Sequence, residues 1–197
     1  MWNRIWILLL FVILQATCHA QRIRPLENLT LLGKSNALLW AATVPNVGAE
    51  LVVNNRYSID FPIVYCPYTV KRDYNLKSLL FLPEFRYYIN TSLRGHFVGV
   101  HAHIGYFSVA TNNTTRYQDR GADSPLWGFG LSYGYRLPLS SRWNVEFTAG
   151  LGYANIRYDA FYNIPHGAQY DAGTKNYFGL TRLGVSFVYR IKDWRLK

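Results

Sequence analysis

The chain has 197 residues, a length that fits a single domain. It carries 21 Lys and Arg against 11 Asp and Glu, a formal net charge of +10, yet only 16% of its residues are charged and 17% are aromatic. This composition excludes a disordered chain, which is rich in charge and poor in aromatic residues. The two cysteines, Cys18 and Cys66, exclude a disulfide-rich scaffold and a cysteine-based zinc site.

Residues 1–20 have the layout of a secretory signal peptide. Arg4 precedes an unbroken apolar run from Ile5 to Leu14, and small and polar residues follow as far as Ala20. A transmembrane anchor needs about 20 apolar residues, so this run is too short for one. Cys18 could instead be a lipidated first residue. We expect cleavage after Ala20 and a periplasmic N-terminal arm over residues 21–34.

The body of the chain alternates apolar and small or polar residues with a period of two. In residues 126–137, Trp127, Phe129 and Leu131 alternate with Gly128 and Gly130, and residues 143–154 repeat the pattern. A soluble sandwich also alternates, but these segments run for 10 residues or more, which suits strands that cross a membrane. Aromatic residues gather near the strand ends, as in the girdles of membrane barrels: Trp127, Tyr133, Tyr135, Trp143, Tyr153, Tyr177 and Tyr189.

Short and long connections alternate along the chain. The short ones are 54–55, 90–94 and 138–142, and the longer, polar ones are 69–76, 110–124 and 159–174. We therefore predict an all-β fold, an eight-stranded antiparallel up-and-down transmembrane β-barrel over residues 35–191, with a basic C-terminal tail at 192–197. The predicted strands are 35–43, 46–53, 56–67, 77–89, 95–109, 126–137, 143–157 and 175–191. For the first hairpin, the sequence is compatible either with two strands or with one bent strand.

Several stretches resemble a Bacteroidetes family of small outer-membrane β-barrels of unknown function. They are Asn36–Ala41 with Pro45–Gly48, Leu82–Tyr88, Gly95–His101, Tyr133–Tyr135 with Arg142–Glu146, and Asn176–Arg182. The resemblance implies an eight-stranded barrel of the outer-membrane-protein-A membrane-domain type, and it implies no activity. The sequence departs from the family at Leu180, where a proline is expected, and in the loop 159–174, which lacks paired cysteines.

The alternation places charged side chains inside the barrel. The inward residues include Glu50, Asp60, Glu84, Arg86, His101, His103, Arg136, Glu146 and Arg182. Because unpaired buried charges cost several kcal/mol each, we predict a packed ion-pair network and no open pore. His101 and His103, with a carboxylate, have the spacing of zinc ligands, but histidines hydrogen-bonded within a polar lumen are the preferred interpretation, so no metal and no cofactor are expected.

The expected function is that of an outer-membrane β-barrel of structural or surface-display type, with a filled lumen and no catalytic role. No nucleophile elbow supports an enzyme such as a lipid-modifying hydrolase. The sequence is also compatible with a narrow channel for ions or small solutes, and with a soluble exported lipocalin-like barrel with an apolar cavity. Candidate contacts of the external loops are Tyr117, Arg120, Phe161, Tyr162 and His166.

The expected partners follow from the basic residues at both rims and from the export signal. They are outer-membrane lipid and lipopolysaccharide, the barrel-assembly machinery, and an unidentified external ligand or protein. Nucleic acid is not expected, because an exported chain without a basic helix is a poor match to nucleic-acid-binding proteins. We expect a monomer in the cell outer membrane.

Overall fold

The computed structural model describes residues 28–71, 74–91, 93–110, 114–121 and 124–195. The expected signal peptide, residues 21–27 of the expected arm and residues 196–197 of the tail lie outside this part of the chain. Among the described residues, no helix is both long and apolar enough to cross a membrane.

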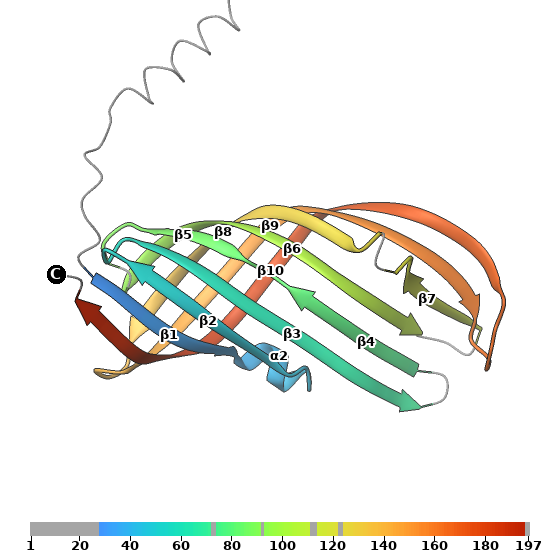
Figure 1. Ribbon diagram of the computed structural model, residues 1–197, viewed down its shortest axis with the longest axis horizontal. Helices are drawn as coiled ribbons and strands as arrows, with labels where there is room; N and C mark the ends of the chain where they lie inside the picture. The colour runs from blue at the N-terminus through green and yellow to red at the C-terminus, as the bar shows by residue number, and fades with distance from the viewer. Residues whose placement is uncertain (1–27, 72–73, 92, 111–113, 122–123, 196–197) are drawn as a thin grey trace, which may run out of the picture.

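The fold is an antiparallel ring of strands (Figure 1). Its elements are β1 (Asn28–Asn36), α2 (Ala37–Ala41), β2 (Asn46–Val53), β3 (Tyr57–Lys71), β4 (Tyr74–Phe81), β5 (Glu84–Tyr88), β6 (Gly95–Ala110), β7 (Thr115–Asp119), β8 (Leu126–Pro138), β9 (Trp143–Tyr162) and β10 (Gln169–Arg195). β1 pairs with both β2 and β10, which closes the ring. The predicted all-β antiparallel architecture is confirmed.

Two positions in the ring are each shared by two strands. β4 and β5 both lie between β3 and β6, and β7 and β8 both lie between β6 and β9, so the ring has eight strand positions. The predicted strand 77–89 is divided at Leu82 and Pro83. Pro83 has no N–H to give to the ladder, which explains the break. Its carbonyl still accepts from Ala102 N at 2.9 Å, so the two halves stay in line.

The first predicted strand, 35–43, is wrong. β1 occupies residues 28–36, and residues 37–41 form the single helical turn of α2. The side chain of Asn36 accepts a hydrogen bond from Leu38 N at 3.1 Å and caps the helix. Ala and Leu then favour the helix over a strand. Residues 28–31 of the expected arm pair with residues 192–195 of the expected tail in β1 and β10, and residues 32–34 pair with 188–190.

The three predicted long loops are largely strands. β3 and β4 pair as far as Lys71 and Tyr74, β7 lies within 110–124, and β9 and β10 pair up to Phe161 and Gln169. Polar composition did not end these strands, because a backbone with a neighbouring strand satisfies its N–H and C=O groups by continuing the ladder. The resulting hairpins extend from the end of the ring opposite the start of β1 and the end of β10 (Figure 1).

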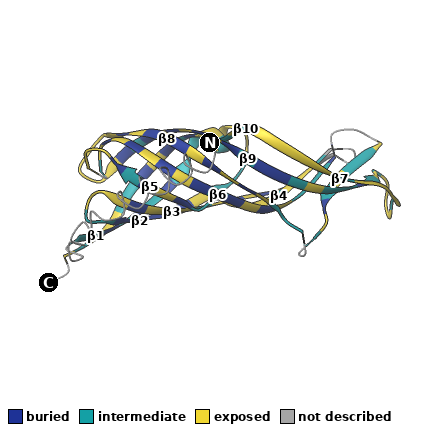
Figure 2. Cartoon of the chain, turned by 90° about the horizontal axis from the view of Figure 1, so that it is seen from above, coloured by how far each residue is buried: buried dark blue, intermediate teal, exposed yellow. Residues whose placement is uncertain are grey.

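Burial alternates along the strands, so polar and apolar residues lie on opposite faces (Figure 2). On β8, Phe129 and Leu131 point outward with 56% and 68% of their surface exposed, while Ser132 and Arg136 are buried. Gly134 also faces inward, where a Cβ would collide with the ring of Phe97. Large apolar side chains therefore lie mostly outside, and the interior combines the buried charged residues with a small apolar cluster of Leu32, Val52 and Val188. A barrel with an apolar cavity would instead require its apolar faces to point inward.

Candidate functional site

The wall of the ring is incomplete beyond α2. The last residue of β1 to pair with β10 is Asn36, opposite Ser186, and the last of β2 to pair with β3 is Asn46, opposite Val64. Beyond these points no strand among the described residues lies between β3 and β10. We call this gap the side opening. The Asn36 amide ends the ladder on β10, since its Nδ2 donates to Leu183 O at 3.1 Å and its Oδ1 accepts from Val185 N at 3.2 Å.

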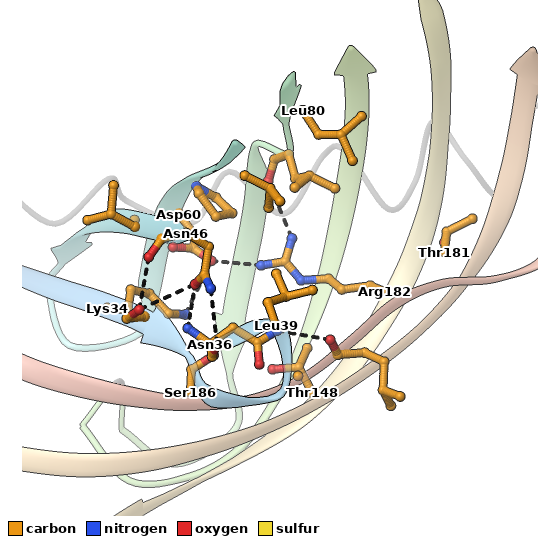
Figure 3. Close-up of a pocket in the computed structure, with 18 of the residues that line it drawn as sticks. Lys34, Asn36, Leu39, Asn46, Asp60, Leu80, Thr148, Thr181, Arg182 and Ser186 are labelled. Carbon is orange, nitrogen blue, oxygen red and sulfur yellow. Dashed lines mark hydrogen bonds and ion pairs between the residues drawn. The ribbon is translucent and has the colours of Figure 1, made fainter. Parts of the chain in front are cut away.

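A cavity of about 330 Å³ lies at the side opening (Figure 3). Its outer rim is apolar, with Leu39 and Val47 on one side and Leu180 and Leu183 on the other. Its inner end is polar and is lined by Lys34, Asp60, Thr148, Arg182 and Ser186. The cavity is therefore amphipathic, and it connects the outer surface of the ring with its charged interior.

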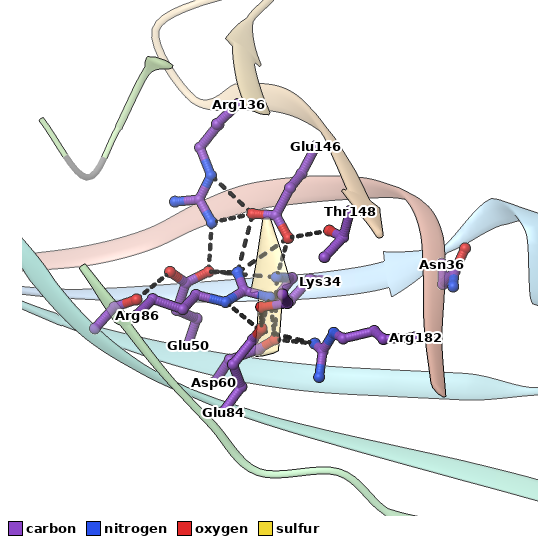
Figure 4. A network of polar contacts seen from close by, with 12 residues as sticks. Lys34, Asn36, Glu50, Asp60, Glu84, Arg86, Arg136, Glu146, Thr148 and Arg182 are labelled. Atoms are coloured by element: carbon purple, nitrogen blue, oxygen red, sulfur yellow. Dashed lines mark hydrogen bonds and ion pairs between the residues drawn. The ribbon is translucent and has the colours of Figure 1, made fainter. Parts of the chain in front are cut away.

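That interior is organised around Arg86 on β5 (Figure 4). The guanidinium lies 2.5 Å from Glu84, 2.8 Å from Asp60, 3.0 Å from Glu146 and 3.3 Å from Glu50. It also lies over the ring of Phe97, 4.6 Å from the ring centroid. These carboxylates come from β2, β3, β5 and β9, so one arginine ties together strands from opposite sides of the ring.

Three further cations complete the cluster. Arg136 pairs with Glu146 and lies 2.5 Å from Glu50. Lys34 Nζ lies 2.6 Å from Glu146, 3.2 Å from Asp60 and 3.5 Å from Glu50. Arg182 lies 2.8 Å from Asp60 and 3.2 Å from Glu84. We name the polar cluster by its eight charged members: Lys34, Glu50, Asp60, Glu84, Arg86, Arg136, Glu146 and Arg182.

The polar cluster has four cations and four carboxylates, so its formal charge is zero. Neutral side chains complete the hydrogen bonding, because Ser58 donates to Glu50 at 2.6 Å and Tyr88 donates to the same carboxylate at 2.8 Å. Ser132 donates to Glu84. Such a balanced set is tolerated away from water, whereas removal of one member leaves a partner charge uncompensated.

The structure brings together seven of the nine residues predicted to line the lumen. Glu50, Asp60, Glu84, Arg86, Arg136, Glu146 and Arg182 are all in the polar cluster. Lys34 was missed because it falls at the end of the predicted N-terminal arm, residues 21–34. A signal was present, since the predicted inward residues included four acids but only three arginines, and Lys34 lies two residues from Leu32 on β1. Ser58 and Tyr88 were also missed, although each lies two residues from a predicted inward residue and so shares its face.

His101 and His103 lie beside the polar cluster, outside its ion pairs. Their rings are 5.9 Å apart, and His101 Nε2 lies 2.9 Å from Thr181 Oγ1. The Nδ1 atoms of both rings are buried, with no hydrogen-bond partner among the described residues. In this part of the chain, no three His, Cys, Asp or Glu side chains are grouped to hold a metal ion.

The five candidate external contacts lie in paired hairpins or the turn that joins them. The Tyr117 ring meets that of Tyr158 edge-on at 5.5 Å, and Arg120 pairs with Asp159 at 3.0 Å. The Arg116 guanidinium covers the Phe161 ring at 5.2 Å, and the Tyr162 and Tyr170 rings are 4.8 Å apart. His166 lies in the β9–β10 turn with a φ of 56°. Four of the five thus pack against neighbouring strand segments, three of them across the β7–β9 pairing and Tyr162 within the β9–β10 hairpin.

Comparison with known protein families gives a match over most of the chain. Residues 6–191 match the family described as "Protein of unknown function (DUF3575)", and the chain belongs to this family. No curated protein matches the chain. The family description assigns no activity, in agreement with the resemblance to a family of unknown function.

Proposed function

We propose that this member of the DUF3575 family is an outer-membrane β-barrel with a packed polar interior and a structural or surface-display role without catalysis. The observation that carries the proposal is the reversal of the two faces. Charged side chains such as Arg86 and Arg136 are fully buried, while large apolar side chains on the strands point outward and are exposed. In water such a surface is unfavourable, but in a bilayer it is the lipid-facing side.

The height of the exposed apolar belt supports a membrane setting. Trp143 and Tyr153 mark its two edges on β9 and are ten residues apart. Ten residues of strand span about 33 Å, and a tilt of about 40° reduces this to about 25 Å along the barrel axis, the height of the apolar band in such barrels. Trp143 packs against Tyr189 at 4.8 Å, and Tyr57 packs against Tyr87 at 5.5 Å, as expected for an aromatic girdle.

The orientation follows from the lengths of the connections. The short turns and both described chain ends lie at one end of the ring, and the extended hairpins lie at the other (Figure 1). Short turns face the periplasm in barrels of this kind, so the hairpins face outward. Outer-membrane lipid and lipopolysaccharide are then the immediate surroundings, and the barrel-assembly machinery is the partner for insertion.

The packed interior favours a display role over a channel. Arg86 and Arg136 lie across the lumen and are tied to carboxylates on several strands, so they fill the cross-section. An eight-stranded barrel is just wide enough for its side chains to fill it. In planar bilayers we expect no conductance above that of the bare membrane.

The first test is a gel of the outer-membrane fraction, run with and without boiling. A closed barrel stays folded in cold detergent, so the proposal predicts a band in this fraction whose mobility shifts on boiling. A protein found in the soluble periplasmic fraction without a shift would refute it. Steady single-channel currents from the purified protein would instead favour the channel.

A further inference from the structure

We infer that the side opening is a lateral binding site for a single-chain lipid with an uncharged, hydroxyl-bearing head, of the monoacylglycerol class. The inference rests on the proposed membrane setting. The head would enter the ring at the polar inner end of the cavity, and the acyl chain would leave between α2 and β10 into the bilayer.

The depth of the opening supports lateral entry. On β10 the aromatic residues Tyr177 and Tyr189 lie near the two edges of the apolar belt, and pairing with β1 ends between them, at Ser186. The gap therefore begins within the belt and faces hydrocarbon. Leu180 and Leu183 on one side of it, and Val47 on the other, are at least half exposed, so a chain passing between them meets apolar surface throughout.

The strand edges at the opening have backbone N–H and C=O groups that polar groups of a ligand could bind. Past Ser186, the Asn36 amide bonds Val185 N and Leu183 O of β10, and among the described residues no strand pairs with the β10 edge beyond Leu183 on this side. On β3, the last hydrogen bond on this side runs from Tyr65 N to Pro45 O at 3.0 Å. Strand edges without partners are unfavourable at membrane depth, where each unsatisfied group costs several kcal/mol. A head with several hydroxyl groups offers both donors and acceptors to these edges.

The charge balance at the polar inner end of the cavity favours an uncharged lipid headgroup over an ionised one. Because the polar cluster is balanced at four cations and four carboxylates, an ionised head would add an uncompensated charge. Asp60, which lines the cavity, is fully buried, and its Oδ1 has no hydrogen-bond partner among the described residues. Arg182 is the most exposed cation of the polar cluster, with 13% of its side chain accessible. A hydroxyl group can donate to a carboxylate and accept from a guanidinium, and it brings no charge.

The size of the cavity fits a head and the first carbons of a chain. Its volume of about 330 Å³ lies at the lower end of the range for small-molecule sites. The remainder of the acyl chain would stay in the bilayer. Only the head and its nearest carbons would then lose their lipid environment.

The experiment uses the full-length protein, purified from outer membranes and placed in phosphatidylcholine vesicles. A monoacylglycerol that carries a diazirine in its acyl chain is photolysed, and the labelled peptides are identified by mass spectrometry. We expect labelling concentrated on residues 37–48 and 178–184, and competition by unlabelled monoolein. Oleate and oleylamine, with charged heads and the same chain length, should compete at least about tenfold less well.

Two variants distinguish labelling at the side opening from labelling by general contact with the bilayer. Leu183→Trp places an indole in the opening, and Leu131→Trp adds the same bulk on the far wall, where Leu131 is similarly exposed. We expect the first to reduce labelling about tenfold and the second to leave it within about twofold. Labelling spread evenly over the outward residues of all strands, or equal competition by oleate, would overturn the inference.

Heat-modifiable mobility in the same vesicles reports on the barrel independently of the ligand. A protein that is inserted and heat-modifiable but shows no preferred labelling would refute the lipid site and leave the proposed function standing. A protein that fails to insert would refute both.

Discussion

The Arg86→Met variant tests whether the polar cluster stabilises the ring. Arg86 is fully buried and lies within 3.3 Å of four carboxylates. Methionine keeps much of the volume but leaves four carboxylates facing three cations. Removing one partner of a buried ion pair costs about 3–5 kcal/mol, because the remaining charge is left without compensation. For a domain of this size, that corresponds to a Tm about 6–20 °C lower.

The assay is thermal unfolding in detergent micelles, followed by the loss of the heat-modifiable band and by circular dichroism. Arg56→Met is the matched control, since Arg56 is exposed at a turn and donates to Tyr87 Oη at 3.2 Å. A surface change of this kind should alter the unfolding free energy by less than about 0.5 kcal/mol.

A double variant separates charge balance from packing. Arg86→Met with Glu84→Gln returns the cluster to three cations and three carboxylates. We expect it to regain about 1–3 kcal/mol relative to the sum of the single variants, the range of coupling between residues in one network. An Arg86→Met protein as stable as the Arg56→Met control would refute the reasoning, as would a double variant no more stable than the sum.

Further predictions concern the outer face, the missed lysine and the packed interior. Leu131→Arg should make the inserted barrel about 2–4 kcal/mol less stable, whereas Ser141→Arg in a turn should leave its stability unchanged. Urea titration in vesicles measures both variants, and equal unfolding midpoints would contradict the lipid-facing assignment of Leu131. Lys34→Met should destabilise the ring by about 3–5 kcal/mol in the same titration, whereas a residue in an unpaired arm would have no effect. Gly134→Val should cost about 1–3 kcal/mol, because its side chain would collide with Phe97, and an unchanged Tm would show that the interior yields there.

The sequence by itself determined which side chains face inward. Side-chain direction alternates with each residue of a strand, so Glu84 and Arg86 had to share a face, and so did Trp127 and Phe129 on β8. It also predicted the hairpins with short connections, because the turns near Asn54, Asn90 and Pro138 consist of turn-forming residues, but it left the first hairpin open and misplaced its first strand. These features depend on neighbouring residues and are readable without the fold.

Only the tertiary structure decided which charges meet and where the wall opens. Arg86 contacts carboxylates from three other strands, and that depends on strand register, which no single segment specifies. Lys34 joins the polar cluster because β1 pairs with β2 and β10 from Asn28 onward, a long-range choice that also leaves residues 37–41 to form α2. The side opening exists because the β1–β2 hairpin is shorter than the neighbouring strands β3 and β10. The length of a strand depends on how far a neighbouring strand continues beside it, which only the folded chain decides.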